Sequence, residues 1–388
     1  MKLSRLTSPV AALLALSLLG GCSRGRGIYS NYRALETLQL AEVLGVDRAE
    51  DGSVVLSAAV AKGKDDSGGG MLRSRAAGLV AGLEALQDRA VRGQVFFAHT
   101  HSIVLGQAYA ENGVGALLDY VERDVHTRMG TDLFVVRDGT AEALLTGSGE
   151  DWDAGGVLRS VRTETETRGD SHVFSLRETA VDLSEYGAAL LCALRLVAAE
   201  AGDAAAAPGI SAVPDGFGIL KDGRLLGFLD GDEALAASLL RGTLGAVPMA
   251  LPDGSGGDAT LEVRCGAPEF LFSRNADGAL FLTVRAAPEA VIAAADGGAD
   301  VTAPETLDAL TDALNARLAA DIEAVLARSK ALDADFLALQ RALRLQGTGP
   351  DGLPPDWLRA LTVSVTVDAR LQRSNDMGER AGTDGGGG

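Results

Sequence analysis

The clearest pattern of hydrophobic and polar positions lies in residues 93–147. Residues 95–105 are rich in β-branched and aromatic side chains, and residues 116–121 carry apolar side chains at helical spacing. Residues 133–136 are apolar again and are followed by a turn at Gly139. A strand, a helix and a second strand in this order form a right-handed crossover within one sheet. The pattern therefore predicts that residues 93–147 form the centre of an α/β domain.

Strand patterns precede this centre. Residues 53–61 predict a strand that pairs as a hairpin with residues 44–47, because an Asp-Gly turn separates them. Residues 35–45 suit either a short helix or the edge of a sheet.

Two further segments of the first half predict helices. Residues 71–89 have apolar side chains at helical intervals, and residues 185–200 form an Ala/Leu run that Ser184 would cap. Residues 148–169 between them are acidic and rich in Gly and Thr, which predicts a long exposed connection.

The second half begins with a hairpin pattern at residues 216–229, which turns at Lys221-Asp222-Gly223-Arg224. Further strands are predicted at residues 260–265, 269–273, 280–284 and 363–367. The longest helical pattern covers residues 304–330, with Thr302 as its cap and Pro304 in its first turn. Its apolar stripe consists of Leu307, Leu310, Leu314, Leu318, Ile322 and Val325.

These elements predict an α+β protein of two or three small mixed-sheet domains flanked by helices. The predicted divisions are a signal peptide (1–21), a lipidated tether (22–31), an N-terminal α/β domain (32–200), a linker (201–212), a C-terminal α+β region (213–377, with 213–255 and 256–377 as optional subdomains) and a disordered tail (378–388).

The amino-terminal segment predicts the compartment. Lys2 and Arg5 precede a short apolar run, and the order Leu19-Gly20-Gly21-Cys22 has the form of a bacterial lipobox. Cys22 is therefore the predicted lipidation site, which would anchor the protein on the extracytoplasmic side of the cell membrane. The alternative is an ordinary secretory signal with an incidental cysteine.

Composition narrows the range of partners. The formal net charge is -18, and such an excess of acid argues against nucleic-acid binding. The two cysteines beyond Cys22, Cys192 and Cys265, lie in apolar segments and predict buried free thiols, with a disulfide between them as the alternative.

The sequence offers few candidate catalytic or metal-binding residues. His99 and His101 alternate on a predicted strand and would share a face, but the sequence suggests no third ligand, so a structural histidine pair is favoured over a metal site. Asp222 and Asp230-Gly231-Asp232 lack the spacing of a calcium loop and suit turns and caps. The sequence contains no motif of a catalytic nucleophile, a phosphate-binding loop or a dinucleotide-binding fold. It therefore gives no reason to expect an enzyme or a bound cofactor.

Arg123 and Asp124 follow the predicted central helix. An arginine there satisfies the last carbonyl groups of a helix, so the pair suits a structural role, with contact to a partner protein as the second interpretation.

Several motifs in order resemble the Ger(x)C family, the lipoprotein C subunit of spore nutrient germinant receptors. They are the lipobox, FFAHTHSIVLG, the YVERD that contains Arg123 and Asp124, LFVVRDGTAEALL, GILKDGRLLGFLDGDEA, and the ALDADFLALQRALRLQ…PPDW…VSVTVDARL ending. One departure is Ser23-Arg24, which stands where the family commonly has Trp-Asp after the lipid cysteine.

The resemblance implies a non-catalytic receptor subunit at the spore inner membrane, working with integral-membrane A and B subunits. The alternative from another class is an extracytoplasmic solute-binding or envelope-scaffold lipoprotein outside germination. A metal-dependent hydrolase is the third interpretation and depends on His99 and His101 alone.

Overall fold

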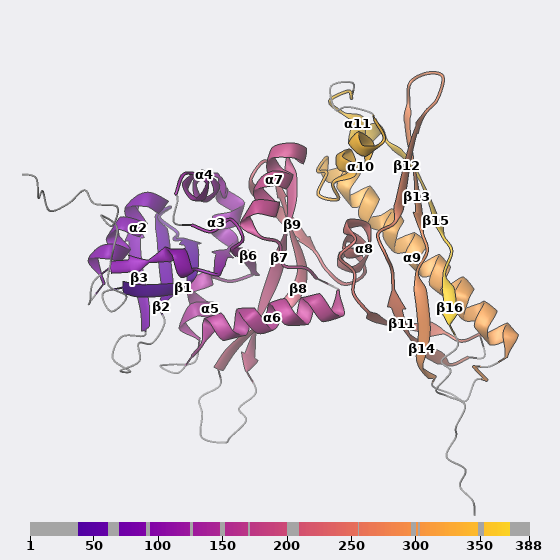
Figure 1. Cartoon of the computed structure of the whole chain (residues 1–388), viewed down its shortest axis with the longest axis horizontal. Helices are drawn as coiled ribbons and strands as arrows, with labels where there is room; N and C mark the ends of the chain where they lie inside the picture. Colours follow the sequence, from indigo (N-terminus) through magenta and orange to yellow (C-terminus); the bar gives the residue numbers. More distant parts are fainter. Residues whose placement is uncertain are drawn as a thin grey trace, which may run out of the picture.

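The computed structural model describes residues 38–60, 70–90, 94–124, 127–147, 152–169, 171–199, 209–254, 256–295, 300–301, 303–347 and 353–372. Its chain forms a sheet unit followed by a second unit built around one long helix (Figure 1). The signal peptide, Cys22, the tether, the Thr302 cap and the tail after residue 377 lie outside the described residues. None of the helices in the described ranges is long and apolar enough to cross a bilayer.

The first unit contains a nine-stranded sheet in the order β3-β2-β1-β5-β6-β7-β8-β9, with β4 paired to β1 beside this path. Strands β1, β5, β6 and β7 run parallel to one another, while hairpins add antiparallel strands at both edges. The strands are β1 (Leu38–Arg48), β2 (Val54–Val60), β3 (Gly70–Ala76), β4 (Gln94–Phe96), β5 (Ser102–Gly106), β6 (Asp132–Arg137), β7 (Ala188–Ala199), β8 (Gly209–Lys221) and β9 (Arg224–Leu229).

Helices cover both faces of this sheet. One face packs against α2 (Leu79–Asp88), α3 (Gln107–Asn112), α4 (Gly115–Arg123) and α7 (Leu176–Tyr186). The other face packs against α5 (Ala141–Thr146) and α6 (Ala154–Arg168). Parallel strands buried on both faces explain why β5 and β6 read as continuous apolar runs.

The second unit combines two small sheets with helix α9 (Pro304–Leu332), which has 29 residues. One sheet has the order β10-β11-β14-β16 and the other β12-β13-β15. The strands are β10 (Val247–Pro252), β11 (Asp258–Arg264), β12 (Glu269–Arg274), β13 (Leu280–Ala286), β14 (Glu289–Ala295), β15 (Thr362–Val367) and β16 (Arg370–Gln372). The remaining helices are α8 (Gly231–Arg241), α10 (Leu339–Leu345) and α11 (Trp357–Ala360).

A continuous apolar core joins the two units. Leu190 of β7 and Phe217 of β8 belong to the same buried cluster as α8, α9 and the strands of the second unit. Helix α8 lies between the large sheet and α9, as Figure 1 shows. The α+β class and the mixed sheets agree with the prediction from sequence.

Several predicted elements are confirmed. The central order of strand, helix and strand appears as β5, α4 and β6, and the 216–229 hairpin appears as β8 and β9. The long C-terminal helix forms as predicted, and its stripe is buried from Leu310 to Val325, with Leu307 packed partly against the core.

Three predicted elements are wrong. The helix predicted at residues 185–200 is replaced by strand β7 (Ala188–Ala199), because a strand between β6 and β8 is buried on both faces and needs no polar alternation. Residues 148–169 contain helix α6 rather than an exposed connection, and the Asp153 side chain caps it by accepting from the Gly156 amide. Residues 71–89 divide into strand β3, which pairs with β2, and helix α2.

The segment around the histidines also differs from its prediction. Residues 95–105 do not form one strand but divide into β4, the 3-10 turn η2 (Phe97–His99) and β5. His99 and His101 therefore both precede strand β5 and do not alternate on it.

The last four residues of the predicted linker belong to a strand. Strands β7 and β8 are hydrogen-bonded as far as Ala199 and Gly209, so residues 209–212 belong to a strand. The first sheet continues past the predicted 201–212 division and ends with β9 at Leu229.

Candidate functional site

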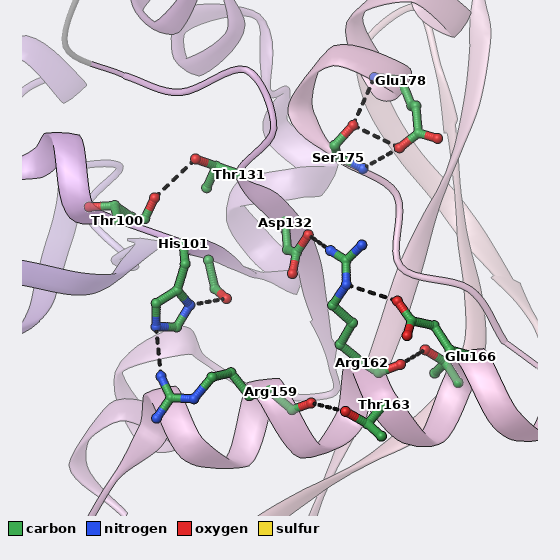
Figure 2. Close-up of polar contacts among 12 residues, drawn as sticks. Thr100, His101, Thr131, Asp132, Arg159, Arg162, Thr163, Glu166, Ser175 and Glu178 are labelled. Atoms are coloured by element: carbon green, nitrogen blue, oxygen red, sulfur yellow. Dashed lines mark hydrogen bonds and ion pairs between the residues drawn. The ribbon is translucent and has the colours of Figure 1, made fainter.

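A polar cluster lies between helix α6 and the points where β5 and β6 begin (Figure 2). His101 contacts Ser102 through Nδ1 at 2.9 Å and Arg159 through Nε2 at 3.1 Å. A guanidinium group can only donate, so Nε2 accepts and Nδ1 carries the proton that is donated to Ser102. Burial lowers the pKa of His101, and the Arg159 cation lowers it further. His101 is thus held neutral, in one tautomer.

An ion pair next to His101 fixes the same helix. Asp132 is buried at the start of β6 and pairs with Arg162 of α6, whose Nε also donates to Glu166 at 3.1 Å. Burial raises the pKa of Asp132, while Arg162 opposes that rise. The Asp132 amide donates to the His101 carbonyl at 2.9 Å, which joins the two contacts. This arrangement attaches α6 to the amino ends of two parallel strands.

The structure does not bring the two predicted histidines to a common ligand position. His99 is exposed on η2, near the Phe96 ring at 6.1 Å, while His101 is occupied by Ser102 and Arg159. His172 packs edge-on against Phe174, and His126 lies outside the described residues. Within the described ranges, no group of three His, Cys, Asp or Glu side chains is arranged to hold a metal ion.

Arg123 and Asp124 lie at the end of α4, as predicted, and their side chains have separate partners. Arg123 pairs with Asp119 at 2.8 Å, and both side chains are largely exposed. The Asp124 carboxylate accepts from the Thr127 hydroxyl at 2.7 Å, and the Asp124 amide donates to the Tyr120 carbonyl at 2.9 Å. Asp124 therefore stabilises the exit of the chain from α4, whereas Arg123 faces solvent.

A groove of about 540 Å³ runs between the first turn of α2 and the exposed side of α4. Its walls are formed by Gly78, Leu79, Val80, Ala81, Ala116, Asp119, Tyr120, Arg123 and Asp124. The sequence predicted Arg123 and Asp124 as notable residues but not this groove, because α2 and α4 are distant in the sequence and lie side by side only in the folded chain.

Cys192 and Cys265 are both buried free thiols, which agrees with the favoured interpretation of the sequence. Burial raises the pKa of the Cys265 thiol. A buried thiol with a raised pKa is a poor nucleophile, so neither the geometry nor the ionisation of Cys265 suits catalysis.

Comparisons with known proteins agree with this fold. The chain aligns at residues 31–196 with the spore germination protein N-terminal domain, and at residues 215–375 with the domain described as spore germination B3/GerAC like, C-terminal. No curated protein matches the chain.

One solved structure, titled "Crystal Structure of the GerBC protein", is similar to this chain with a TM-score of 0.55 and 17% sequence identity. The match covers 87% of this chain and 99% of the other, and at this identity it speaks for the fold alone. The two family matches, in the expected order over most of the chain, show that it belongs to the GerAC, or Ger(x)C, family of spore germination proteins.

Proposed function

We propose that this protein is the C subunit of a spore nutrient germinant receptor, with integral-membrane A and B subunits as its partners. The observation that carries the proposal is the pair of GerAC-like domain matches at residues 31–196 and 215–375, in the family order. The similarity to the GerBC fold along 99% of that chain supports it.

Co-purification from detergent-solubilised spore membranes tests this assignment. A tagged copy of the full chain is expected to bring down the A and B subunits encoded beside it. Recovery of a permease and an ATPase instead would favour a solute-binding lipoprotein and contradict the proposal.

The proposed attachment is a lipid on Cys22, at the inner membrane of the spore. The sequence Leu19-Gly20-Gly21-Cys22 supports this, and the net charge of -18 supplies no attraction to anionic headgroups that would replace an anchor. Cys22→Ala should release the protein from membranes, while the matched variant Ser23→Ala should remain bound. Retention of the Cys22→Ala protein after a high-salt wash would show that another feature holds it.

The proposed role is non-catalytic. The contacts between α6 and the sheet support this, because their polar side chains are paired with one another: His101 with Arg159, and Asp132 with Arg162. Each of these groups connects α6 to the sheet. Arg159 also lines the hollow along α6, where its guanidinium group contacts His101 and Asp153. Arg123 and Asp124 have, in this proposal, a structural role at the end of α4.

A further inference from the structure

The groove between α2 and α4 exposes apolar side chains at the surface of the sheet unit. Val80 is 55% exposed, and Ala81 and Ala116 beside it are also exposed. An open hollow of about 540 Å³ with an exposed valine on its wall has the size and character to receive one or two apolar side chains of an extended segment.

The surface beside this groove is acidic. Helix α2 carries Glu84 and Asp88, and its nearest basic residue in the chain is the exposed cap Arg89. Val80, Glu84 and Asp88 share one exposed face because they lie four residues apart. Within the described ranges, neither carboxylate is joined to a cation by an ion pair. Across the groove, Asp119 and Asp124 lie on the wall together with one cation, Arg123, which pairs with Asp119. The groove therefore suits a basic segment with apolar side chains.

The chain contains such a segment just before β1. Residues 24–33 read RGRGIYSNYR, with three arginines, no acidic residue, and Ile28, Tyr29 and Tyr32 between them. The rest of the sequence is strongly acidic, since the whole chain carries a net charge of -18. A second copy of the acidic unit, or an anionic bilayer, would be repelled by the same groove.

The point where β1 begins is close enough for this segment to reach the groove. Leu38 pairs with Gln94 of β4, and the Gln87 side chain at the end of α2 holds Val95 of β4 through two hydrogen bonds of 2.9 and 3.0 Å. The chain thus enters the sheet beside the last turn of α2, and the groove lies at its first turn, about 15 Å away for a ten-residue helix. The residues between 33 and 38 span up to about 17 Å when extended.

We propose that residues 24–33 bind back along the acidic face of α2, with an apolar side chain of the segment in the groove between α2 and α4. The arginines would pair with Glu84 and Asp88, and the aromatic residues would cover Val80. Cys22 lies two residues before Arg24, so this contact would turn the α2 and α4 side of the sheet unit toward the attachment point of the chain. The contact requires neither lipidation nor a receptor partner, so it stands or fails separately from the proposed function.

Disulfide trapping in the full chain tests the contact. With Cys22→Ser throughout, the pair Tyr29→Cys and Val80→Cys is compared with the pair Tyr29→Cys and Val181→Cys, because Val181 on α7 is similarly exposed at 48%. Cys192 and Cys265 are buried and stay in place. We expect the intramolecular disulfide to residue 80 to form at least about tenfold faster under mild oxidation, as a local increase in effective concentration requires.

A charge variant separates binding from mere proximity. Adding Glu84→Lys and Asp88→Lys to the Tyr29→Cys and Val80→Cys chain should slow the disulfide several-fold, and salt should slow the parent pair in the same way. A thermal melt of each variant confirms that it is folded. Equal rates for residues 80 and 181, a rate insensitive to the charge reversal, or a disulfide formed only between two molecules would each overturn the proposal.

Discussion

Two buried carboxylates hold the first turn of a helix in the two units of the molecule, and they do so over different distances. Asp47, near the end of β1, accepts from the amides of Ala141 and Glu142 in α5, both at 2.8 Å and more than ninety residues away. Asp335 accepts from the amides of Leu339 and Gln340 in α10 at 2.8 and 2.9 Å, four and five residues away. The first contact joins a strand to a helix across the fold, whereas the second closes a local turn.

The surroundings of the two carboxylates differ as well. A β-carbon on Gly106 would lie 2.0 Å from Oδ1 of Asp47, so the neighbouring strand β5 leaves room for this carboxylate only because residue 106 is glycine. Burial raises the pKa of Asp47, while its two backbone hydrogen bonds lower it. Burial of Asp335 raises its pKa from 3.8 to about 7. The long-range contact of Asp47 thus depends on the close approach of β5 at Gly106, whereas the local contact of Asp335 depends on the ionisation of its carboxyl group.

The largest expected effect is the pH dependence that Asp335 gives to stability. The pKa of Asp335 is about 7 in the folded state, against its ordinary value of 3.8, so between these values the folded protein holds a proton that the unfolded chain has lost. The protonated Asp335 contributes its full stabilisation below pH 3.8. This contribution to the unfolding free energy is lost as the pH rises toward 7, and the loss reaches roughly 4 kcal/mol.

The variant Asp335→Asn should therefore flatten the unfolding free energy between pH 4.5 and about 7.5, measured by urea denaturation. Asp312→Asn, on the exposed side of α9, serves as the control and should keep the slope of the parent protein. Identical slopes for the parent and Asp335→Asn would show that Asp335 does not titrate in this window.

The next effect is the loss of the long-range contact. Asp47→Ala leaves the amides of Ala141 and Glu142 without their acceptor in a buried place, at a cost of about 3 kcal/mol. Glu50→Ala, in the exposed turn after the same strand, is the control. Chemical denaturation should separate the two variants clearly. A similar midpoint for both would mean that water or another group replaces the carboxylate at α5.

The sequence predicts best those elements whose pattern is complete within a short window. Helix α9 repeats its apolar positions over 29 residues, so the sequence predicts both its length and its buried stripe. Strand β7 could not be predicted in this way. Ala and Leu favour helices, and only pairing with β6 and β8 makes this segment a strand that is buried on both faces.

The same limit applies to the polar sites. Arg123 and Asp124 could be singled out because they end a visible helical pattern, but the contacts of Asp47 with α5 and of Asp132 with Arg162 join distant segments. One local signal was present and was missed. Ser175 and Glu178 have the spacing of a capping box, and they begin α7.

A smaller effect is expected at this cap. The Ser175 hydroxyl accepts from the Glu178 amide, and the Glu178 carboxylate accepts from the Ser175 amide at 2.8 Å. Ser175→Ala should lower the unfolding free energy by about 1 kcal/mol, and Ser175→Thr, which keeps the hydroxyl that donates to Glu178, should restore most of it. A variant series by thermal denaturation measures this. If the alanine and threonine variants unfold alike, the cap contributes less than the packing of Leu176 behind it.

The smallest effect is expected at Arg123. Its ion pair with Asp119 joins side chains that are 78% and 63% exposed, and exposed pairs within one helix turn contribute little to stability. Arg123→Ala should therefore leave the thermal midpoint unchanged, whereas Asp124→Ala, which removes the acceptor of the Thr127 hydroxyl, should lower it slightly. If Arg123 contacts no partner protein, spores carrying Arg123→Ala should also germinate as the parent does. An unchanged midpoint together with a lost germination response would assign Arg123 to partner recognition, and a large drop in the midpoint would show that the exposed pair holds α4 more firmly than its geometry indicates.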